Sequence, residues 1–390
     1  MKVAIVGAGP AGAHLATLLS QNGCEVLLFD ARAKPWEKPC GGGVTTKALR
    51  EFAFLNGSNA EKQLVSTVRV IGASGREVSV QPKADFAIYS RAELDRLMRT
   101  RAIDAGVNFI CARVARIARK TSQWELKTQE GHDYTCDFLV GADGAASKLR
   151  PKFGIEFKPR DFIYGLGWHI KTDNPQDWDA SRVDIKYLPN CAGYIWAFPR
   201  PDHISYGIAT KYQEKSPLHL KSLLLDFITT QLPAVGHEIK AATHHTTPHA
   251  TFYGAMIPSL AVATWDQLKV SDAAQNWALV GDAAGFVDPV TGEGIYYAIK
   301  SAELLAQAIL TRTKDYEAMW RAEFGAEMRR AAEMLPRFYY GKFLGQPFTE
   351  RVIQFARHHR GVRDTLNDLI AGDQDYVGLK RRLFKSMLTI

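Results

Sequence analysis

The stretch MKVAIVGAGPAGAHLATLLSQNGCEVLLFD, residues 1–30, decides the fold of this chain. Residues 3–6 form a short apolar run bounded by glycine, which predicts a buried strand. Three glycines follow with the spacing G-x-G-x-x-G, and residues 13–19 then have helical spacing. Residues 25–29 predict a second strand. A strand, a glycine turn, a helix and a strand in this order predict a dinucleotide site.

Each glycine of this turn has its own physical role. Gly7 allows the tight turn, Gly9 lets the backbone approach a pyrophosphate, and Gly12 lets the helix pack against the strand. Asp30 follows Gly12 by 18 residues and ends the second strand, where a carboxylate can accept a hydrogen bond from a ribose hydroxyl. A glycine-rich turn of another α/β fold is the alternative. The strand, the helix and the acid together favour the dinucleotide site.

Length and composition predict a globular protein of two domains. The chain has 390 residues, more than one ordinary core holds, and 46% of them are hydrophobic and 23% charged. No apolar run approaches the ~20 residues of a membrane span, and the N-terminal stretch does not resemble a signal peptide. We therefore expect a cytoplasmic protein, with membrane association as an alternative. The five cysteines lack paired spacing, which predicts reduced thiols.

The formal net charge of +8 favours negatively charged binding partners. It suits an anionic substrate, an acidic electron carrier or, as a peripheral membrane contact, an anionic lipid surface. No nucleic-acid recognition motif accompanies the charge, so we expect no nucleic-acid partner.

Dinucleotide-type elements recur along the chain, and strand-rich stretches interrupt them. This pattern predicts an α/β fold: a doubly wound cofactor-binding domain with an inserted, mostly antiparallel β-sheet substrate domain and a helical C-terminus. The expected boundaries are 1–64, 85–160 and 270–335 for the cofactor domain, 65–84 and 161–269 for the substrate domain, and 336–390 for the C-terminal helical segment.

Two later glycine turns agree with the first. Asp143 and Gly144 end a strand in the stretch GADGAASKLR, and Ser147 and Arg150 follow at positions that suit holding phosphate or ribose. Asp282 ends the next strand in GDAAG, where it can accept a hydrogen bond from a sugar or ribityl hydroxyl. The stretch GEGI, residues 292–295, then begins a long helix whose positive end can stabilise negative charge.

Over roughly residues 1–310 these motifs resemble the FAD-dependent oxidoreductases of the aromatic hydroxylase type. The resemblance implies that the first glycine turn holds the FAD pyrophosphate, that Asp30 binds the adenosine ribose, and that Arg91 in SRAELDRL contacts the cofactor. GADGAAS and GDAAG match the second and third fingerprints of that family. The cofactor-binding residues that the resemblance implies are Gly7, Gly9, Pro10, Ala11, Gly12, Asp30, Ala31, Arg32, Gly42, Gly43, Arg91, Val114, Asp143, Gly144, Gly281, Asp282, Pro289, Gly292, Gly294 and Ile295.

Two stretches narrow the resemblance to the geranylgeranyl reductase family, flavoenzymes that saturate isoprenoid double bonds. KPCGGGV carries Cys40, and Y-x-W-x-F-P is formed by Tyr194, Trp196, Phe198 and the proline after it. The resemblance implies that Cys40 lies near the isoalloxazine as a candidate catalytic residue, and that the three aromatic residues line the substrate tunnel. The archaeal-type loop more often has a glutamate where Gly42 stands here.

Plainer interpretations remain open for these residues. Cys40 can be an ordinary buried thiol, and the alternating aromatic residues can belong to an ordinary core face. The histidines at 244, 245 and 249 predict a solvated loop rather than a metal site, because a proline and threonines interrupt helical spacing.

The sequence favours a reductase that saturates C=C bonds of a prenyl, geranylgeranyl-type or related hydrophobic substrate by hydride transfer from reduced FAD. No second G-x-G-x-x-G is present, so NAD(P)H or an electron-carrier protein is expected to supply electrons transiently. The rival hypotheses are an FAD-dependent monooxygenase that hydroxylates a hydrophobic or aromatic substrate, a halogenase and a non-catalytic flavin scaffold. A halogenase is disfavoured because its W-x-W-x-I-P signature is replaced by Y-I-W-A-F-P.

Overall fold

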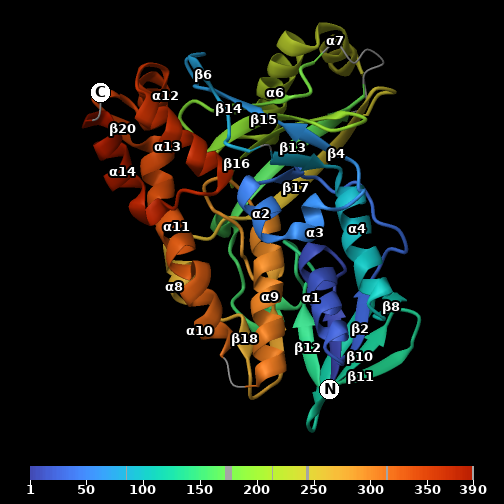
Figure 1. The fold of residues 1–390 in the computed structure, drawn as a ribbon. Coiled ribbons are helices and arrows are strands. Elements are labelled where there is room, and N and C mark those ends of the chain that lie inside the picture. The colour runs from blue at the N-terminus through green and yellow to red at the C-terminus, as the bar shows by residue number, and fades with distance from the viewer. Residues whose placement is uncertain (85, 172–177, 213, 243–245, 313–314, 389–390) are drawn as a thin grey trace. The chain divides into compact units, whose positions relative to one another are not determined.

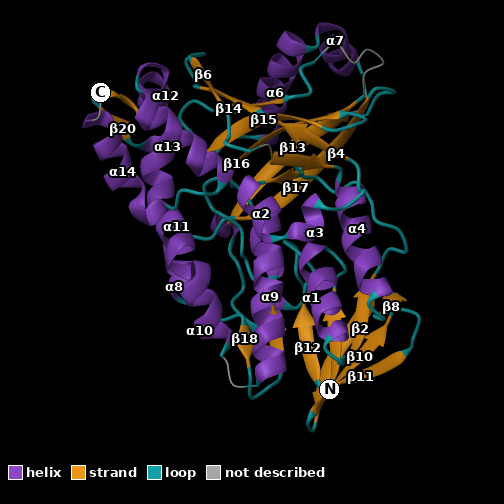
Figure 2. Cartoon of the chain, viewed as in Figure 1, coloured by secondary structure: helices purple, strands orange, loops and turns teal. Residues whose placement is uncertain are grey.

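The chain passes three times through each of two structural units. The computed structural model describes residues 1–84, 86–171, 178–212, 214–242, 246–312 and 315–388 (Figure 1). The first unit comprises Met1–Glu37, Arg91–Asp161 and Ile257–Ala332, and the second comprises Lys38–Ser90, Phe162–Met256 and Glu333–Ile390. An α/β fold with several sheets and helices is confirmed (Figure 2).

A six-stranded sheet forms the centre of the first unit. Its order is β18-β19-β12-β1-β2-β8, and every pairing is parallel except that of β18 with β19. The inner strands are short and buried, as in parallel sheets that are covered on both faces. The strands are β1 (Lys2–Val6), β2 (Glu25–Asp30), β8 (Asn108–Cys111), β12 (Phe138–Gly141), β18 (Ser271–Asp272) and β19 (Trp277–Leu279).

Three longer helices pack in this unit: α1 (Pro10–Gln21) contacts both α4 (Arg91–Asp104) and α9 (Ile295–Thr311). Pro10 starts α1, and Gly23, with φ +79°, follows its C-terminus in the left-handed conformation that ends many helices. The remaining elements are α5 (Arg150–Phe153), α8 (Val262–Asp266), α10 (Tyr316–Trp320), the 3₁₀ turns η1 (Pro159–Asp161) and η3 (Gly281–Ala283), the π-helical turn η4 (Arg321–Gly325), and a three-stranded antiparallel sheet of β9 (Val114–Lys120), β10 (Gln123–Thr128) and β11 (Asp133–Cys136).

A seven-stranded sheet forms the centre of the second unit. Its order is β17-β13-β16-β15-β14-β5-β6, and all the described pairings are antiparallel except that of β14 with β5. Ile195 and Ile208 pack from the sheet against Leu224 and Ile228 of α6 (Pro217–Gln231), with α7 (Pro233–Ala241) next in the chain. The strands are β5 (Thr67–Ile71), β6 (Glu77–Val80), β13 (Phe162–Ile170), β14 (Arg182–Tyr187), β15 (Gly193–Pro199), β16 (Ile204–Lys211) and β17 (Ala250–Pro258).

A second hydrophobic cluster of this unit includes Val70, Val80, Ile353 and Ala356, so the C-terminal helices pack on β5 and β6. The other elements are β3 (Gly43–Val44), β4 (Lys62–Val65), β7 (Phe86–Tyr89), α2 (Thr46–Glu51), α3 (Ala53–Asn56), β20 (Lys342–Phe343), β21 (Gln346–Pro347), α12 (Phe348–His358), α13 (Arg360–Ala371) and α14 (Tyr376–Leu388). Helix α11 (Ala326–Tyr340) begins in the first unit and continues into the second from Glu333. Among the described residues, no helix combines the length and the apolar character needed to cross a bilayer.

The unit boundaries differ from the expected domain boundaries. Residues 38–64 and 86–90, assigned from sequence to the cofactor domain, lie in the second unit, where β4 pairs with β7. Residues 257–269, assigned to the substrate domain, lie in the first unit, where Ser259 N donates to Asp161 O at 2.8 Å. The C-terminal helices do not stand apart, since their apolar side chains complete the second cluster.

Candidate functional site

The first glycine turn leaves no space for side chains at Gly7 and Gly12. A Cβ at Gly7, whose φ is +111°, would lie 2.2 Å from the Ala142 carbonyl oxygen. A Cβ at Gly12 would lie 1.9 Å from the Gly7 carbonyl oxygen. Gly9 is the N-cap of α1 and Pro10 its first residue, with Ala11 next. This bare backbone at the start of a 12-residue helix fits a dinucleotide pyrophosphate.

Asp30 is tied to the same turn by backbone hydrogen bonds. Its Oδ2 accepts from Ala8 N at 3.1 Å, and its Oδ1 accepts from Arg32 N at 2.9 Å. Ala31 lies between the two contacts, and the Arg32 guanidinium stacks 4.0 Å from the ring centroid of Trp36. Each carboxylate oxygen has a further lone pair, and the side chain is 22% exposed, so Asp30 can still accept from a ribose hydroxyl.

The sequence analysis missed Arg99, which supports the loop after Asp30. Arg99 Nη1 donates to Arg32 O at 2.8 Å and to Ala33 O at 3.0 Å, and Nη2 lies 3.7 Å from Asp30 Oδ2. Arg91 lies eight residues earlier on α4, about two turns away, so both arginines lie toward one side of the helix. The spacing of eight residues from Arg91 was the sequence pattern from which a role of Arg99 could have been predicted. The Arg91 guanidinium is held by Asp95 Oδ1 at 2.9 and 3.2 Å, and its contact with the cofactor stays a prediction.

The third glycine turn lies against the starts of two helices. A Cβ at Gly281 would lie 3.0 Å from Ala11 Cβ, and Gly281 N donates to Ser301 Oγ of α9 at 3.0 Å. A Cβ at Gly294 would lie 3.1 Å from Asp282 Oδ1. The structure therefore brings Asp282 close to the N-terminus of α9, which begins at Ile295.

The second glycine turn lies beside the first, since a Cβ at Gly7 would lie 3.0 Å from Asp143 N. Asp143 Oδ2 accepts from Lys148 N at 2.7 Å, and Gly144, with φ +80°, gives the turn its shape. The residues that the structure brings together are thus Gly7, Ala11, Asp143, Gly281, Asp282 and Gly294, all in the first unit.

Arg150 and Ser147, whose positions suit a phosphate or ribose contact, make hydrogen bonds within the protein. Arg150 Nη2 donates to Ala145 O at 3.1 Å, and Nη1 donates to Ala283 O at 3.3 Å. Ser147 Oγ accepts from Arg150 N at 2.9 Å. Burial lowers the pKa of Arg150 to about 10. The guanidinium therefore joins the second and third turns, and a contact of Arg150 with phosphate or ribose stays a prediction.

The other predicted cofactor residues of the first unit are placed as follows. Pro289 O accepts from Ser259 Oγ at 3.0 Å, and Gly292, with φ +76°, donates its N–H to Asp288 O at 2.9 Å. Val114 begins β9, where it pairs with Thr128 in the small antiparallel sheet, and its contact with the cofactor stays a prediction.

In the second unit, the carbonyl group of Cys40 is anchored on the large sheet. Arg200 Nη2 donates to Cys40 O at 2.6 Å, and Ser205 Oγ donates to the same oxygen at 3.3 Å. Arg200 follows β15, and Ser205 lies on β16. Cys40 Sγ accepts from Gly42 N at 3.3 Å. The cysteine loop thus has a defined conformation on the sheet.

The first two glycines after Cys40 are required by this packing. A Cβ at Gly41 would lie 2.7 Å from Phe198 Cδ2. Gly42 has φ +80°, and its Cβ would lie 2.0 Å from Tyr89 O. Gly43 opens β3 and lies over the same Phe198 ring. Contacts inside the second unit therefore explain glycine at positions 41 and 42, and cofactor binding by Gly42 and Gly43 stays a prediction.

The three aromatic residues alternate along β15 and share one face of the sheet. The helix-covered cluster uses the intervening Ile195 and Ala197, so the aromatic side chains point away from it. Trp196 is 6% exposed and lies flat over β16, because a Cβ at Gly207 would lie 2.0 Å from its Cζ2. The Tyr194 and Trp196 rings are 5.9 Å apart, and Phe198 packs partly on the second cluster.

The sequence analysis also missed the hydrogen-bonded group of Arg200, Asp202 and His203, which contacts the cysteine loop through Arg200. His203 Nε2 lies 3.0 Å from Arg200 Nη1, and His203 Nδ1 lies 2.7 Å from Asp202 Oδ1. Because a guanidinium only donates, Nε2 must accept and Nδ1–H must donate to Asp202. The stretch FPRPDHIS, with its basic residue after FP, carried a local signal for this group.

Tyr253 extends the group from a strand distant in sequence. Its hydroxyl donates to Tyr206 O at 3.0 Å and lies 3.1 Å from Ser205 Oγ. Its ring stacks on His169 at 4.4 Å between centroids. Burial raises the pKa of Tyr253 well above its usual value, so the hydroxyl stays protonated. No local sequence pattern links Tyr253 or His169 to Cys40.

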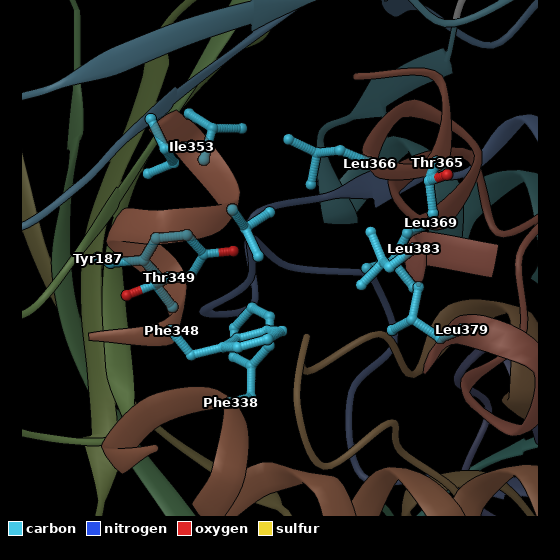
Figure 3. Close-up of a pocket in the computed structure, with 12 residues that line it drawn as sticks. Tyr187, Phe338, Phe348, Thr349, Ile353, Thr365, Leu366, Leu369, Leu379 and Leu383 are labelled. Carbon is cyan, nitrogen blue, oxygen red and sulfur yellow. The ribbon is translucent and has the colours of Figure 1, made fainter. Parts of the chain in front are cut away.

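An apolar cavity of the second unit lies elsewhere, among Tyr187, Phe338, Leu383 and their neighbours (Figure 3). Its volume of about 20 Å³ has room for roughly one water molecule. We interpret it as a packing gap of the C-terminal helices. As to the predicted histidine loop, His244 and His245 lie outside the described residues, and His249 Nδ1 lies 2.8 Å from Glu238 Oε2.

Comparison with known proteins agrees with the geometry of the glycine turns. Residues 1–191 match the model of an FAD binding domain. An uncharacterized protein of Methanosarcina barkeri is 30% identical over 87% of this chain and 83% of its own length. A menaquinone reductase of Mycobacterium tuberculosis is 28% identical, covering 96% of this chain and 93% of the relative. A geranylgeranyl diphosphate reductase of Rhodobacter capsulatus is 29% identical, covering 80% of this chain and 75% of the relative.

Among solved structures, a geranylgeranyl bacteriochlorophyll reductase-like protein of Thermoplasma acidophilum has a similar fold. Its TM-score is 0.75 at 20% identity, covering 99% of this chain and 98% of that one. At this identity the likeness concerns the fold alone.

Proposed function

Because the chain belongs to the FAD-dependent oxidoreductases of the geranylgeranyl reductase family, we propose that it saturates C=C bonds of a prenyl chain or a related hydrophobic substrate. FAD is its cofactor. The observation that carries the proposal is the anchoring of Cys40 by Arg200 on the aromatic face of the second unit.

The aromatic face suits a hydrophobic substrate. Tyr194, Trp196 and Phe198 place their rings on the side of the sheet opposite α6 and α7, where Trp196 is 6% exposed. An apolar chain needs such walls, because the polar groups of a site give it orientation but little affinity. Arg200 is 1% exposed and engaged with Cys40 and His203, so the positive charge for a substrate head group must come from another residue.

FAD, when bound and reduced, supplies a hydride for one alkene carbon. The other carbon needs a proton, and we assign its delivery to Cys40. Since Cys40 Sγ accepts a hydrogen bond from Gly42 N, the hydrogen of its own thiol remains available for donation. Arg200 and Ser205 hold the Cys40 carbonyl and thereby orient this thiol.

Electrons reach the flavin from NAD(P)H or from an electron-carrier protein in this proposal. The net charge of +8 suits a negatively charged donor of either kind. We propose that the protein works in the cytoplasm on a substrate that is itself hydrophobic.

The proposal is tested by reducing the FAD-loaded protein without oxygen and then adding a candidate substrate. The names of the relatives provide two candidates, geranylgeranyl diphosphate and menaquinone. We expect flavin reoxidation and a product heavier than the substrate by two hydrogens. Mass spectrometry of lipids that co-purify with the protein extends the search to other prenyl compounds.

A hydroxylated product formed with consumption of oxygen and NAD(P)H would show the alternative, an FAD-dependent monooxygenase, and would overturn the proposal. A flavin that neither accepts electrons from any donor nor passes them to any prenyl compound would leave only a binding role. Each outcome concerns the chemistry and leaves the assignment of FAD untouched.

A further inference from the structure

The hairpin at residues 342–347 carries a leucine that has a positive φ and is exposed to solvent. Strands β20 and β21 pair antiparallel around a two-residue turn in which Leu344 has φ +50° and Gly345 has φ +77°. Such turns favour asparagine, aspartate or glycine at the first position, because other side chains resist a positive φ. Leu344 is nevertheless 68% exposed. An apolar residue therefore stands where both the backbone and the solvent disfavour it.

The protein holds this tip in place. Arg351 Nη2 donates to Leu344 O at 2.6 Å, and Arg351 Nε donates to Phe343 O at 3.2 Å. The Phe343 ring lies 6.2 Å from the ring of Phe355 on α12, yet Phe343 remains 40% exposed. The conformation of Leu344 is thus supported by named contacts, and folding alone gives no reason to keep a leucine there.

The segment around the hairpin is basic. Residues 341–363 include five arginines or lysines and a single acid, Glu350. The Glu350 carboxylate is buried and accepts from Ser74 N at 2.8 Å and from Ser74 Oγ at 2.6 Å. The exposed Lys342 and Arg357 therefore face no exposed acid of the segment, whereas Arg360 pairs with Asp364, one residue beyond it, at 3.8 Å.

We propose that this hairpin docks the protein on an anionic lipid bilayer. Phe343 and Leu344 would enter the interface, and the basic residues of 341–363 would meet the head groups. Aromatic and aliphatic side chains flanked by lysine and arginine suit the lipid boundary. Two side chains at a turn can bury far less surface area than the roughly 800 Å² per partner that a stable protein–protein interface buries. The proposal is independent of which substrate the flavin reduces.

The test uses the full-length FAD-containing protein sedimented with lipid vesicles. Wild type should bind vesicles that contain phosphatidylglycerol, bind phosphatidylcholine vesicles weakly, and be released by salt. Leu344→Asn should lower the binding at least about tenfold, because it removes the apolar tip. Asparagine favours the turn, so the melting temperature should not fall. Arg357→Gln should lower binding to the anionic vesicles about fivefold.

Leu218→Asn is the matched control, because Leu218 on α6 is 79% exposed and belongs to no hairpin. It should bind vesicles as wild type does. The proposal is wrong if wild type does not bind anionic vesicles, or if Leu344→Asn binds them as tightly as wild type does. It is also wrong if both leucine variants lose vesicle binding equally. It is also wrong if Leu344→Asn alters only self-association of the free protein in analytical ultracentrifugation.

Discussion

Arg200 and Cys40 are 160 residues apart in sequence, and a 2.6 Å hydrogen bond joins the guanidinium of one to the carbonyl oxygen of the other. The same guanidinium donates to a His203 ring that Asp202 orients. The shape of the cysteine loop therefore depends on the turn between β15 and β16. Arg200 can thus position the thiol through the Cys40 carbonyl group.

Arg200→Lys should loosen the cysteine loop, because an ammonium cannot reach both Cys40 and His203 with the geometry of a planar fork. We expect stability to fall by about 2–4 kcal/mol, since a buried charged group loses partners. Cys40 should also react faster with a thiol reagent, measured by mass spectrometry of the labelled peptide. Arg116→Lys, at an exposed site of β9, is the control. Equal labelling rates in all three proteins would contradict a positioning role.

Cys40→Ala and Cys40→Ser separate proton donation from shape. Alanine removes the donor, whereas serine keeps a donor of similar size. If the thiol delivers the proton, alanine should slow substrate-dependent flavin reoxidation by about 100- to 10,000-fold, with little effect on flavin reduction. Stopped-flow absorbance measures both steps. Unchanged reoxidation in both variants would make Cys40 an ordinary thiol of the loop.

Gly9→Val should abolish FAD retention and leave the fold intact. Gly9 has φ −75° and ψ −174°, which any residue can adopt, so valine adds bulk without backbone strain. Its side chain would occupy the approach to the pyrophosphate. The ratio of flavin to protein absorbance and the melting temperature of the apoprotein measure the two effects. Gly12→Val should instead disrupt folding, because even a Cβ there would lie 1.9 Å from Gly7 O. Normal FAD content in Gly9→Val would remove the turn from the cofactor site.

Gly207→Ala should displace the Trp196 indole, because the new methyl group would lie 2.0 Å from Cζ2. Overpacking of this kind costs about 1–3 kcal/mol. If the aromatic face binds substrate, the affinity for a prenyl substrate should fall while FAD content stays normal. Adding Trp196→Phe should restore space and part of the stability. A loss of stability with unchanged binding by the folded fraction would return Trp196 to a purely structural role.

His14 should make stability depend on pH. It is 3% exposed, and burial lowers its pKa below the ordinary 6.5 despite Glu303 Oε1 at 3.7 Å from Nε2. The unfolded chain therefore takes up a proton at a higher pH than the folded one. The contribution of this site is complete above about pH 6.5 and declines as the pH falls from there toward the folded pKa.

Thermal melts over this range should show a steeper decline for wild type than for His14→Leu, which cannot titrate. His132→Leu, in an exposed turn, is the matched control and should follow wild type. Parallel curves for wild type and His14→Leu would contradict the assignment.

Local patterns were enough to predict the first glycine turn, the α/β class and the alternation along β15. Each depends on spacing within a few residues: G-x-G-x-x-G bends one turn, and a period of two places Tyr194, Trp196 and Phe198 on one face. The position of Asp30 at the end of β2 followed from the same spacing, and the structure places it against Ala8 N.

The sequence by itself determined the strand–turn–helix units and the candidate residues that they carry, because the backbone geometry of each unit is local. Only the tertiary structure decided that Arg150 joins two glycine turns, that the cysteine loop belongs to the second unit, and that Trp196 faces away from the helix-covered core. These contacts join residues far apart in the chain. They exist because burial requires each polar group to find a partner, and packing across the whole unit decides which partner it finds.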